Sequence, residues 1–212
     1  NRNYKNLVNI LGADHTGYVK RITAAVSALS ENKVKLNCKI CQLVKLYKNG
    51  QPFKMSKRAG DFISVQDLLD EVDKDPIRFM MLNRSNDVEL DFDFDKVKEK
   101  SKDNPVFYVQ YAYARINSLL RSLNISLTNK IDISEKNLNF NKIEEKILRK
   151  VFEWPKITES ASRQFDLHKI PFFLYELSTL FHAYWSKGNE NQDYKFIENE
   201  KIKRQEILLV IN

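Results

Sequence analysis

The sequence predicts an α/β segment followed by an all-α region. Only five glycines and five prolines occur among the 212 residues, which indicates a mostly helical chain with few tight turns. A strand–loop–helix pattern opens the chain, and beyond residue 104 apolar residues recur at helical spacing. The composition changes between residues 85 and 104. We therefore expect one domain over residues 1–104 and a second over residues 105–212.

The first elements follow the order of an open α/β sheet. Apolar residues over 4–13 predict a strand, and residues 12–17 form a polar, glycine-bearing turn. Residues 18–29 carry apolar side chains at helical spacing, and residues 34–47 are again rich in strand formers. In sheets of this kind ligands bind at the carboxyl ends of the strands. The end of the first strand is therefore a candidate ligand site.

The rest of the first domain is punctuated by turn and capping signals. Asn49 with Gly50 is a strong signal for a hairpin turn. Ser64, followed three residues later by Asp67, predicts a capped helix through Val72. Pro76 predicts the start of another helix. An acidic connector over residues 87–95 then leads towards the second domain.

The second domain reads as a helical bundle. The segment 124–141 is polar and has no assigned structure. The spacing of apolar residues predicts helices over 105–123, 142–163, 170–187 and 199 to the end.

Composition limits the possible classes of protein. Hydrophobic residues make up 42% of the chain, enough for a core, and the net charge is +7. An excess of Lys and Arg suits a nucleic-acid partner, because these side chains release counterions from phosphates. A general enrichment in Lys, Asn and Ile explains the charge equally well. With no long uncharged apolar run, we expect no membrane span. The chain starts without Met and ends within an apolar run, so both ends are expected to be cut.

Two cysteines, Cys38 and Cys41, form a single Cys-x-x-Cys pair within a strand-like run. A structural zinc site needs two further ligands at suitable spacing, and the sequence has no second pair. We therefore expect reduced thiols, a cytoplasmic protein and no protein-bound metal.

A basic loop at residues 54–58 carries the strongest chemical signal. Lys54 and Lys57 stand three residues apart on either side of Met55 and Ser56, a spacing that lets two ammonium groups flank a leaving pyrophosphate. Ser56 is suited to hydrogen-bond a phosphate oxygen. Taken alone, such a run is usually a solvated basic turn. Its place between a hairpin and a capped helix favours phosphate binding.

Four stretches in a fixed order carry a family resemblance. GADHTGYVKR, NGQPFKMSKRAGDFISVQDLLDEV, DPIRFMMLNRSNDVELDFDFD and NPVFYVQYAYARI resemble bacterial arginyl-tRNA synthetases, and together they cover most of residues 8–123. The resemblance is softer over 124–212. It implies the C-terminal part of a Rossmann-like class I catalytic domain, then a helical-bundle anticodon-binding domain that is truncated at its C-terminus.

The resemblance also implies substrates and site residues. Such enzymes join L-arginine to tRNA(Arg) with ATP and Mg²⁺, through an arginyl-adenylate. Lys54 and Lys57 would neutralise the pyrophosphate as catalytic residues, within an ATP-binding loop that includes Met55 and Ser56. The ATP site would also include Gly12 and Asp14 beside the adenosine, and His15 near the arginine or ribose. Family members are usually monomers, so a monomer is expected.

Part of the class I machinery is missing. The His-x-Gly-His signature is absent, since the only histidines are His15, His168 and His182. The His15-Thr16-Gly17-Tyr18 segment imitates the signature without its second histidine, and it lies too close to Lys54. We therefore expect a fragment that cannot activate arginine alone. His168 and His182 are predicted to be ordinary structural histidines.

The helix from residue 105 carries the candidate RNA contacts. Its buried face is predicted to contain Val109, Ala112, Ile116, Leu120 and Leu123. Tyr108, Tyr111 and Arg115 cluster beside that face, where they suit unstacked bases but are also ordinary bundle-rim residues. The resemblance implies that both tyrosines contact the anticodon loop and adds Tyr184 as a weaker candidate. Trp185 is predicted to be core.

Two alternatives remain at this stage. One is a standalone RNA-binding helical module with a vestigial nucleotide fold, which the intact pair of loop lysines disfavours. The other is a different class I enzyme, such as a cysteinyl-tRNA synthetase, which the NPVFYVQYAYARI segment disfavours.

Overall fold

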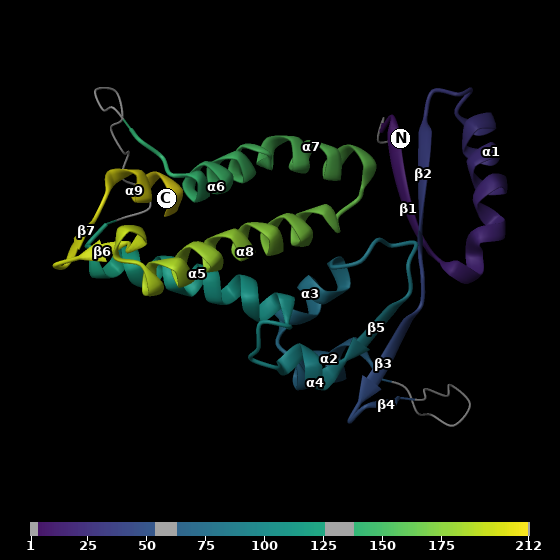
Figure 1. Cartoon of the computed structure of the whole chain (residues 1–212). Helices are drawn as coiled ribbons and strands as arrows, with labels where there is room; N and C mark the ends of the chain where they lie inside the picture. The colour runs from purple at the N-terminus through teal and green to yellow at the C-terminus, as the bar shows by residue number, and fades with distance from the viewer. Residues whose placement is uncertain (1–3, 54–62, 126–137, 212) are drawn as a thin grey trace. The chain divides into compact units, whose positions relative to one another are not determined.

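The computed structural model describes residues 4–53, 63–125 and 138–211. The chain divides into two compact units, Asn1–Lys98 and Glu99–Asn212 (Figure 1).

The first unit begins with a parallel strand pair joined through a helix. Strand β1 (Asn6–Gly12) pairs with β2 (Lys35–Cys41), in a register that sets Gly12 opposite Cys41. The 3-10 helix η1 (Ala13–Tyr18) and helix α1 (Val19–Leu29) connect them (Figure 1). The expected strand–loop–helix unit is therefore present. Both cysteines lie on β2, and both are free thiols.

This β1–α1–β2 segment leaves much apolar surface uncovered. No residue from 4 to 53 is buried. Ile10 of β1 is 69% exposed and Leu29 of α1 is 88% exposed. Hydrophobic burial therefore contributes little to holding this part of the unit together.

A second sheet follows, and it corrects the expectation of an acidic connector over residues 87–95. Strand β3 (Val44–Lys48) pairs antiparallel with β4 (Gln51–Pro52) and parallel with β5 (Leu90–Asp93). The hairpin turn has positive φ at Asn49 (52°) and Gly50 (69°), as predicted. The strand-rich stretch 34–47 contains β2 and most of β3. The acidic connector contains β5, because Leu90 and Phe92 alternate with acidic residues and are buried.

Short helices close this sheet over a small core. Helix α2 (Val65–Glu71) begins at Ser64, which forms a capping box with Asp67. Helices α3 (Lys74–Leu82) and α4 (Phe94–Lys98) complete the unit, and Pro76 is the third residue of α3 rather than its first. The buried cluster consists of Leu68, Val72, Ile77, Phe92, Phe94 and Val97.

The second unit is helical. Its long central helix is α8 (Lys169–Glu190), which contacts α5 (Pro105–Ser122), α6 (Lys142–Phe152) and α7 (Trp154–Gln164) (Figure 1). After α8 come η2 (Gln192–Tyr194), the strands β6 (Ile197–Glu198) and β7 (Lys201–Ile202), and helix α9 (Gln205–Ile211).

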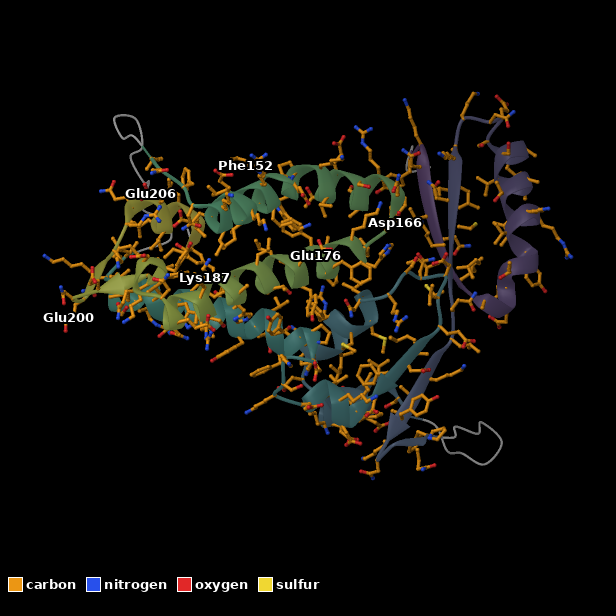
Figure 2. All side chains as sticks on the ribbon, viewed as in Figure 1. Phe152, Asp166, Glu176, Lys187, Glu200 and Glu206 are labelled. Atoms are coloured by element: carbon orange, nitrogen blue, oxygen red, sulfur yellow. The ribbon has the colours of Figure 1, made fainter. Side chains whose placement is uncertain are left out.

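Two helix predictions in this unit were wrong in their extent. The helix expected over 142–163 breaks at Glu153, because Pro155 lacks the amide hydrogen and favours the first turn of a new helix. Phe152, just before the break, is 79% exposed (Figure 2). The helix expected from 199 starts only at Gln205. A tight β6–β7 turn precedes it, with positive φ at Asn199 and Glu200.

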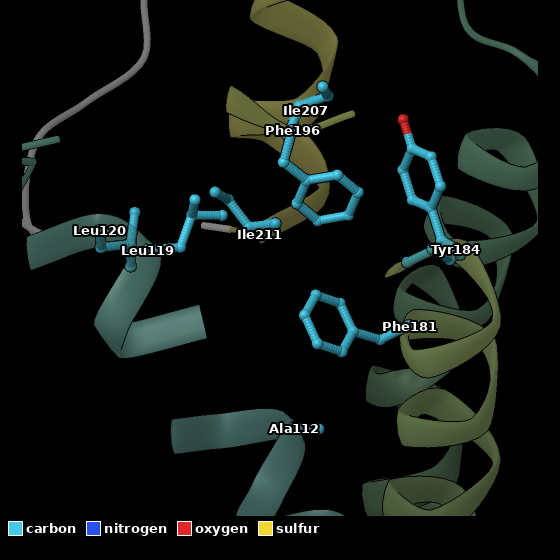
Figure 3. Close-up of a cluster of buried hydrophobic side chains, with 9 residues drawn as sticks. Ala112, Leu119, Leu120, Phe181, Tyr184, Phe196, Ile207 and Ile211 are labelled. Carbon is cyan, nitrogen blue, oxygen red and sulfur yellow. The ribbon is translucent and has the colours of Figure 1, made fainter. Parts of the chain in front are cut away.

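The core of the second unit lies between α5, α8 and the C-terminal segment (Figure 3). It consists of Ala112, Leu119, Leu120, Ile147, Phe181, Tyr184, Phe196, Ile207 and Ile211. Of the face predicted for α5, Ala112 and Leu120 are buried, and Ile116 and Leu123 pack against the cluster. Val109 is only partly buried, and Leu119 takes a core position instead.

Across the ranges 4–53, 63–125 and 138–211, no helix combines the length and the apolar character needed to cross a membrane.

Candidate functional site

The end of β1 brings three predicted nucleotide-site residues together. Gly12 closes the strand, and Asp14 and His15 follow in η1. A Cβ atom on residue 12 would lie 2.7 Å from the Asp14 Oδ1 atom, so glycine lets this carboxylate fold back over the backbone. The His15 Nε2 atom lies 3.5 Å from Asp14 Oδ2, and both side chains are more than half exposed. The Asp14 carboxylate, a hydrogen-bond acceptor, and the His15 imidazole, a donor, are thus both solvent-exposed at the carboxyl end of the parallel strand β1.

Two neighbours extend this polar end of β1. The rings of His15 and Tyr18 are 5.8 Å apart, and the Arg21 guanidinium lies 5.5 Å from the Tyr18 ring. Tyr18 is 52% exposed. The cluster presents an aromatic face and a cation beside the carboxylate.

The predicted phosphate loop, with Lys54, Met55, Ser56 and Lys57, lies outside the described residues. Before it, the Phe53 amide donates to the Leu46 carbonyl at 2.7 Å. After it, Ser64 caps α2. Both stems of the loop are therefore fixed by hydrogen bonds.

Glu71 on α2 ties the hairpin before the loop to the helices after it. Its carboxylate lies 2.8 Å from the Lys48 ammonium and 3.2 Å from that of Lys98. The hydrogen bonds from Lys48 and then Lys98 lower the pKa of Glu71. The Asn49 amide adds a hydrogen bond to Asp95 Oδ2 at 2.6 Å.

Within the part of the chain that the structure describes, no group of three or more His, Cys, Asp or Glu side chains is arranged to hold a metal ion.

The second unit carries a row of flat side chains that we call the stacked ladder: Phe107, Tyr111, Arg115 and Trp185. The Phe107 and Tyr111 rings stack at 5.6 Å with only 11° between their planes. The Arg115 guanidinium lies 4.2 Å from the Tyr111 ring and 5.1 Å from the Trp185 ring. One Arg115 nitrogen also donates to the Tyr111 hydroxyl at 2.6 Å. Tyr111 is 39% exposed, so the ladder reaches solvent.

Tyr108 is less exposed than Tyr111. Its ring is 4.3 Å from His182 and 5.5 Å from Tyr175, both on α8. Burial raises the pKa of the Tyr108 phenol, and the nearby Tyr175 raises it further. Tyr111 is thus the exposed member of the predicted cluster, Arg115 is partly buried beside it, and Tyr108 forms its half-buried base.

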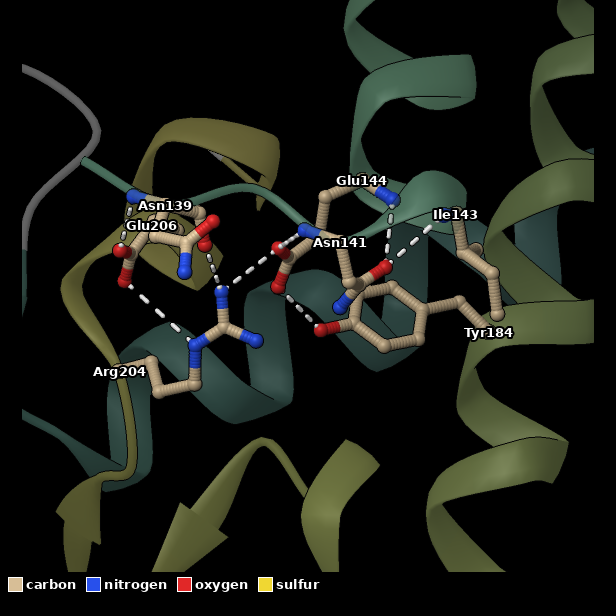
Figure 4. Close-up of polar contacts among 7 residues, drawn as sticks. All are labelled: Asn139, Asn141, Ile143, Glu144, Tyr184, Arg204 and Glu206. Atoms are coloured by element: carbon tan, nitrogen blue, oxygen red, sulfur yellow. Dashed lines mark hydrogen bonds and ion pairs between the residues drawn. The ribbon is translucent and has the colours of Figure 1, made fainter.

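The structure contradicts the expectation that Tyr184 contacts RNA. Tyr184 is 0% exposed, and its hydroxyl donates to Glu144 Oε1 at 2.5 Å (Figure 4). Glu144 is itself 0% exposed, and its Oε2 atom lies 2.9 Å from Arg204. Burial raises the pKa of Tyr184, and the hydrogen bond to Glu144 raises it further. Tyr184 is a core residue that joins α8 to α6.

Trp185, which the sequence suggested was core, is only partly buried. It packs against Phe181 and Phe196 and also faces Arg115. Beside it is a pocket lined by Leu119, Trp185, Gly188, Asn189, Lys195, Phe196 and Ile197. Tyr184 is therefore the fully buried neighbour of the two, and Trp185 packs at the edge of the core cluster.

Sequence reasoning did not place Phe107, His182 or Trp185 beside the predicted tyrosines. The i, i+4, i+8 spacing of Phe107, Tyr111 and Arg115 would have placed these three on one line of a helix. His182 and Trp185 come from another helix, and no local pattern places them against α5.

Comparison with known proteins first gives the class of the second unit. Residues 109–212 match the family model of the DALR anticodon binding domain. This match covers α5 from its fifth residue and every later element of the chain.

Two curated relatives resemble the chain over both units. The chain is 59% identical over 201 residues to an arginine–tRNA ligase of Pelagibacter ubique, and 50% identical over 205 residues to one of Ruegeria pomeroyi. The alignments cover 95% and 93% of this chain but 35% of each relative. The chain is therefore similar to these arginine–tRNA ligases over most of its own length, and it spans about a third of theirs.

Two solved structures resemble the chain in fold. A Campylobacter jejuni structure described as an arginyl-tRNA synthetase superposes with a TM-score of 0.80 at 30% identity, covering 99% of this chain and 44% of that one. The Thermus thermophilus arginyl-tRNA synthetase has a TM-score of 0.65 at 18% identity, covering 98% and 37% respectively, and shows a shared fold.

Proposed function

We propose that this chain is the part of an arginine–tRNA ligase that binds the tRNA anticodon loop and closes over the ATP phosphates. The single observation that carries the proposal is the 59% identity to an arginine–tRNA ligase over 95% of the chain. The relatives named here are arginine–tRNA ligases, and they do not favour a cysteinyl enzyme. A vestigial nucleotide fold is not favoured either, because the identity extends over both units.

In the proposed reaction, the carboxylate of L-arginine attacks the α-phosphate of ATP and pyrophosphate leaves. Arginine then passes from the adenylate to a terminal ribose hydroxyl of tRNA(Arg). Lys54 and Lys57 are proposed to neutralise the charge that develops on the pyrophosphate. Mg²⁺ would enter the reaction bound to the ATP phosphates, as part of the substrate complex.

The first unit is proposed to be the C-terminal part of a Rossmann-like catalytic domain. Its parallel β1–α1–β2 arrangement supports this, as does the position of Gly12, Asp14 and His15 at a carboxyl strand end. These residues would contact the nucleoside of ATP. The uncovered apolar side chains of β1 and α1 indicate that further protein packs there in the working enzyme.

The second unit is proposed to bind the anticodon loop through the stacked ladder. Tyr111 and Phe107 offer ring faces on which unstacked bases can lie, and Arg115 adds a cation for a base or a phosphate. Tyr108, which is half-buried, would contact the anticodon loop through the edge of its ring. Stacking on one aromatic side chain is worth about 1–3 kcal/mol per base. We place the working protein in the cytoplasm as a monomer.

The catalytic half of the proposal is tested in the protein extended to the length of its relatives. Arginine-dependent exchange between ATP and pyrophosphate should be present there and absent in the 212-residue chain. Lys54→Ala or Lys57→Ala should slow the exchange on the order of 100-fold, as expected for the loss of a group that stabilises transition-state charge. Exchange with cysteine instead of arginine would refute the assignment.

The RNA half is tested with the chain itself. Tyr111→Ala and Arg115→Ala should each weaken binding of tRNA(Arg) by roughly 5- to 150-fold, which corresponds to the loss of one stacking contact. Tyr113→Ala is the matched control, because Tyr113 lies on the same helix and is 67% exposed but does not belong to the stacked ladder. An equal loss for Tyr111 and Tyr113 variants would rule out the ladder as the contact surface.

A further inference from the structure

His182 lies at the contact of α5 and α8, directly against the two tyrosines. It is 7% exposed. Its ring centroid is 4.3 Å from that of Tyr108 and 5.5 Å from that of Tyr111, with 24° between the His182 and Tyr111 planes. The imidazole therefore touches the half-buried base of the site and also the underside of the exposed ladder.

A hydrogen bond fixes the imidazole in this place. The His182 Nε2 atom lies 3.1 Å from the backbone carbonyl oxygen of Tyr108. A carbonyl can only accept, so Nε2 must carry the proton and donate it. This hydrogen bond sets the tautomer of His182 and prevents its ring from turning. It joins His182 on α8 to the backbone of Tyr108 on α5.

The ladder transmits this placement to the surface. The Tyr111 ring lies 5.5 Å from the His182 ring and 4.2 Å from the Arg115 guanidinium. Arg115 also donates a hydrogen bond to the Tyr111 hydroxyl. A shift of the Tyr111 ring therefore moves both the aromatic face and the guanidinium. We infer that His182 is a positioning residue, which holds Tyr108 and Tyr111 in the orientation that stacks RNA bases. This inference rests on the RNA contact proposed above.

The groups around His182 favour the neutral form of its imidazole. The groups that face His182 are the phenols of Tyr108 and Tyr111, the Phe181 ring and the Arg115 cation. Burial lowers the pKa of His182, and the Arg115 charge lowers it as well, although the Tyr108 carbonyl acts the other way. A neutral ring keeps a second positive charge away from Arg115.

An ordinary core side chain would fill this space without the cost of burying a polar ring. A buried imidazole is favourable only if its hydrogen bond is made, so its benefit is a unique geometry more than added stability. His182 is not a member of the apolar core cluster that includes Phe181, Tyr184 and Phe196, and it meets that cluster at the Phe181 ring. Stability and ring placement can therefore be separated by experiment.

The test is a double-mutant cycle on the affinity of the chain for tRNA(Arg), with folding checked by circular dichroism. His182→Ala should weaken binding by roughly 3- to 10-fold, a coupling of the usual size between contacting residues. In the Tyr111→Ala background the same substitution should change affinity by less than about 2-fold. His182→Phe keeps a ring of similar shape without the donor, and should show a smaller loss that also disappears in that background. Because it fills the space, it keeps the test informative should the alanine variant not fold.

Phe173→Leu is the control for a purely structural effect. Phe173 is buried on the same helix, but it packs against Trp154, away from the tyrosines. It should lower stability and leave the affinity of the folded protein unchanged. A His182→Ala loss of equal size in both backgrounds, or no loss at all, would overturn the positioning role. If Tyr111→Ala itself has no effect on affinity, the RNA contact proposed above fails, and this inference fails with it.

Discussion

Removal of one buried hydroxyl tests the reassignment of Tyr184 most sharply. The Tyr184 hydroxyl donates to Glu144 Oε1 at 2.5 Å, and both residues are 0% exposed. Arg204 and the Asn141 amide bind the other carboxylate oxygen, at 2.9 Å and 2.8 Å. Tyr184→Phe therefore leaves Oε1 without its hydroxyl donor, in a place that water does not reach.

The size of the effect follows from the charge on the acceptor. A hydrogen bond to a charged group contributes about 1.5–3 kcal/mol, and an unsatisfied buried acceptor costs a similar amount. We expect the free energy of unfolding to fall by about 1.5–3 kcal/mol at neutral pH. The phenyl ring still fills the same space, so no cavity term is added.

The assay is urea unfolding followed by tryptophan fluorescence, because Trp185 lies next to Tyr184 in the same unit. Tyr113→Phe is the control, and as a surface change it should stay within about 0.5 kcal/mol of the wild type. The affinity of the folded variant for tRNA(Arg) should equal that of the wild type. A stability change below about 0.5 kcal/mol, or a clear loss of RNA affinity in the folded variant, would refute the reasoning.

Two further predictions concern α8. Gly188→Ala should lower the free energy of unfolding by about 1–2 kcal/mol despite the better helix propensity of alanine, because the added Cβ would lie 2.8 Å from the Tyr194 carbonyl oxygen. The measurement is urea unfolding, and the control is Gly17→Ala, whose added Cβ would have nothing within 4 Å. For His182 the folded pKa is lowered below its unfolded value of about 6.5, so its contribution to stability is complete above that pH and is lost as the pH falls towards the folded pKa. Stability curves from pH 7.5 to 5 should therefore be steeper for the wild type than for His182→Asn, by at most about 1.4 kcal/mol per pH unit; parallel curves would show that His182 does not titrate differently on folding.

Local signals in the sequence predicted much of the fold. The Asn49-Gly50 turn, the Ser64 capping box and the helices starting at 105 and near 170 are all present, because short-range geometry decides them. The boundaries failed where a local signal was overlooked. Pro155 splits the helix expected over 142–163, and the alternation from Leu90 to Asp93 makes a strand of the acidic connector.

The candidate site was predictable only in part. Tyr111 and Arg115 lie four residues apart on one helix, so helical geometry alone brings them together. Tyr184 and Trp185 are adjacent on α8, and which of them faces the core depends on the rotation of α8 against α5 and α6. That rotation is set by long-range contacts, such as Tyr184 with Glu144, that no sequence period reveals.

The most direct measurement of the RNA contact compares two hairpins cut from one tRNA(Arg), the anticodon stem–loop and the acceptor stem. Their affinities for the 212-residue chain are measured by fluorescence anisotropy at a single salt concentration, so that nonspecific phosphate binding contributes alike to both. The anticodon hairpin should bind at least about 10-fold more tightly, through its unpaired bases, and Tyr111→Ala should remove most of that difference. Equal binding of the two hairpins, or a preference for the acceptor stem, would contradict the proposal that the stacked ladder reads the anticodon loop.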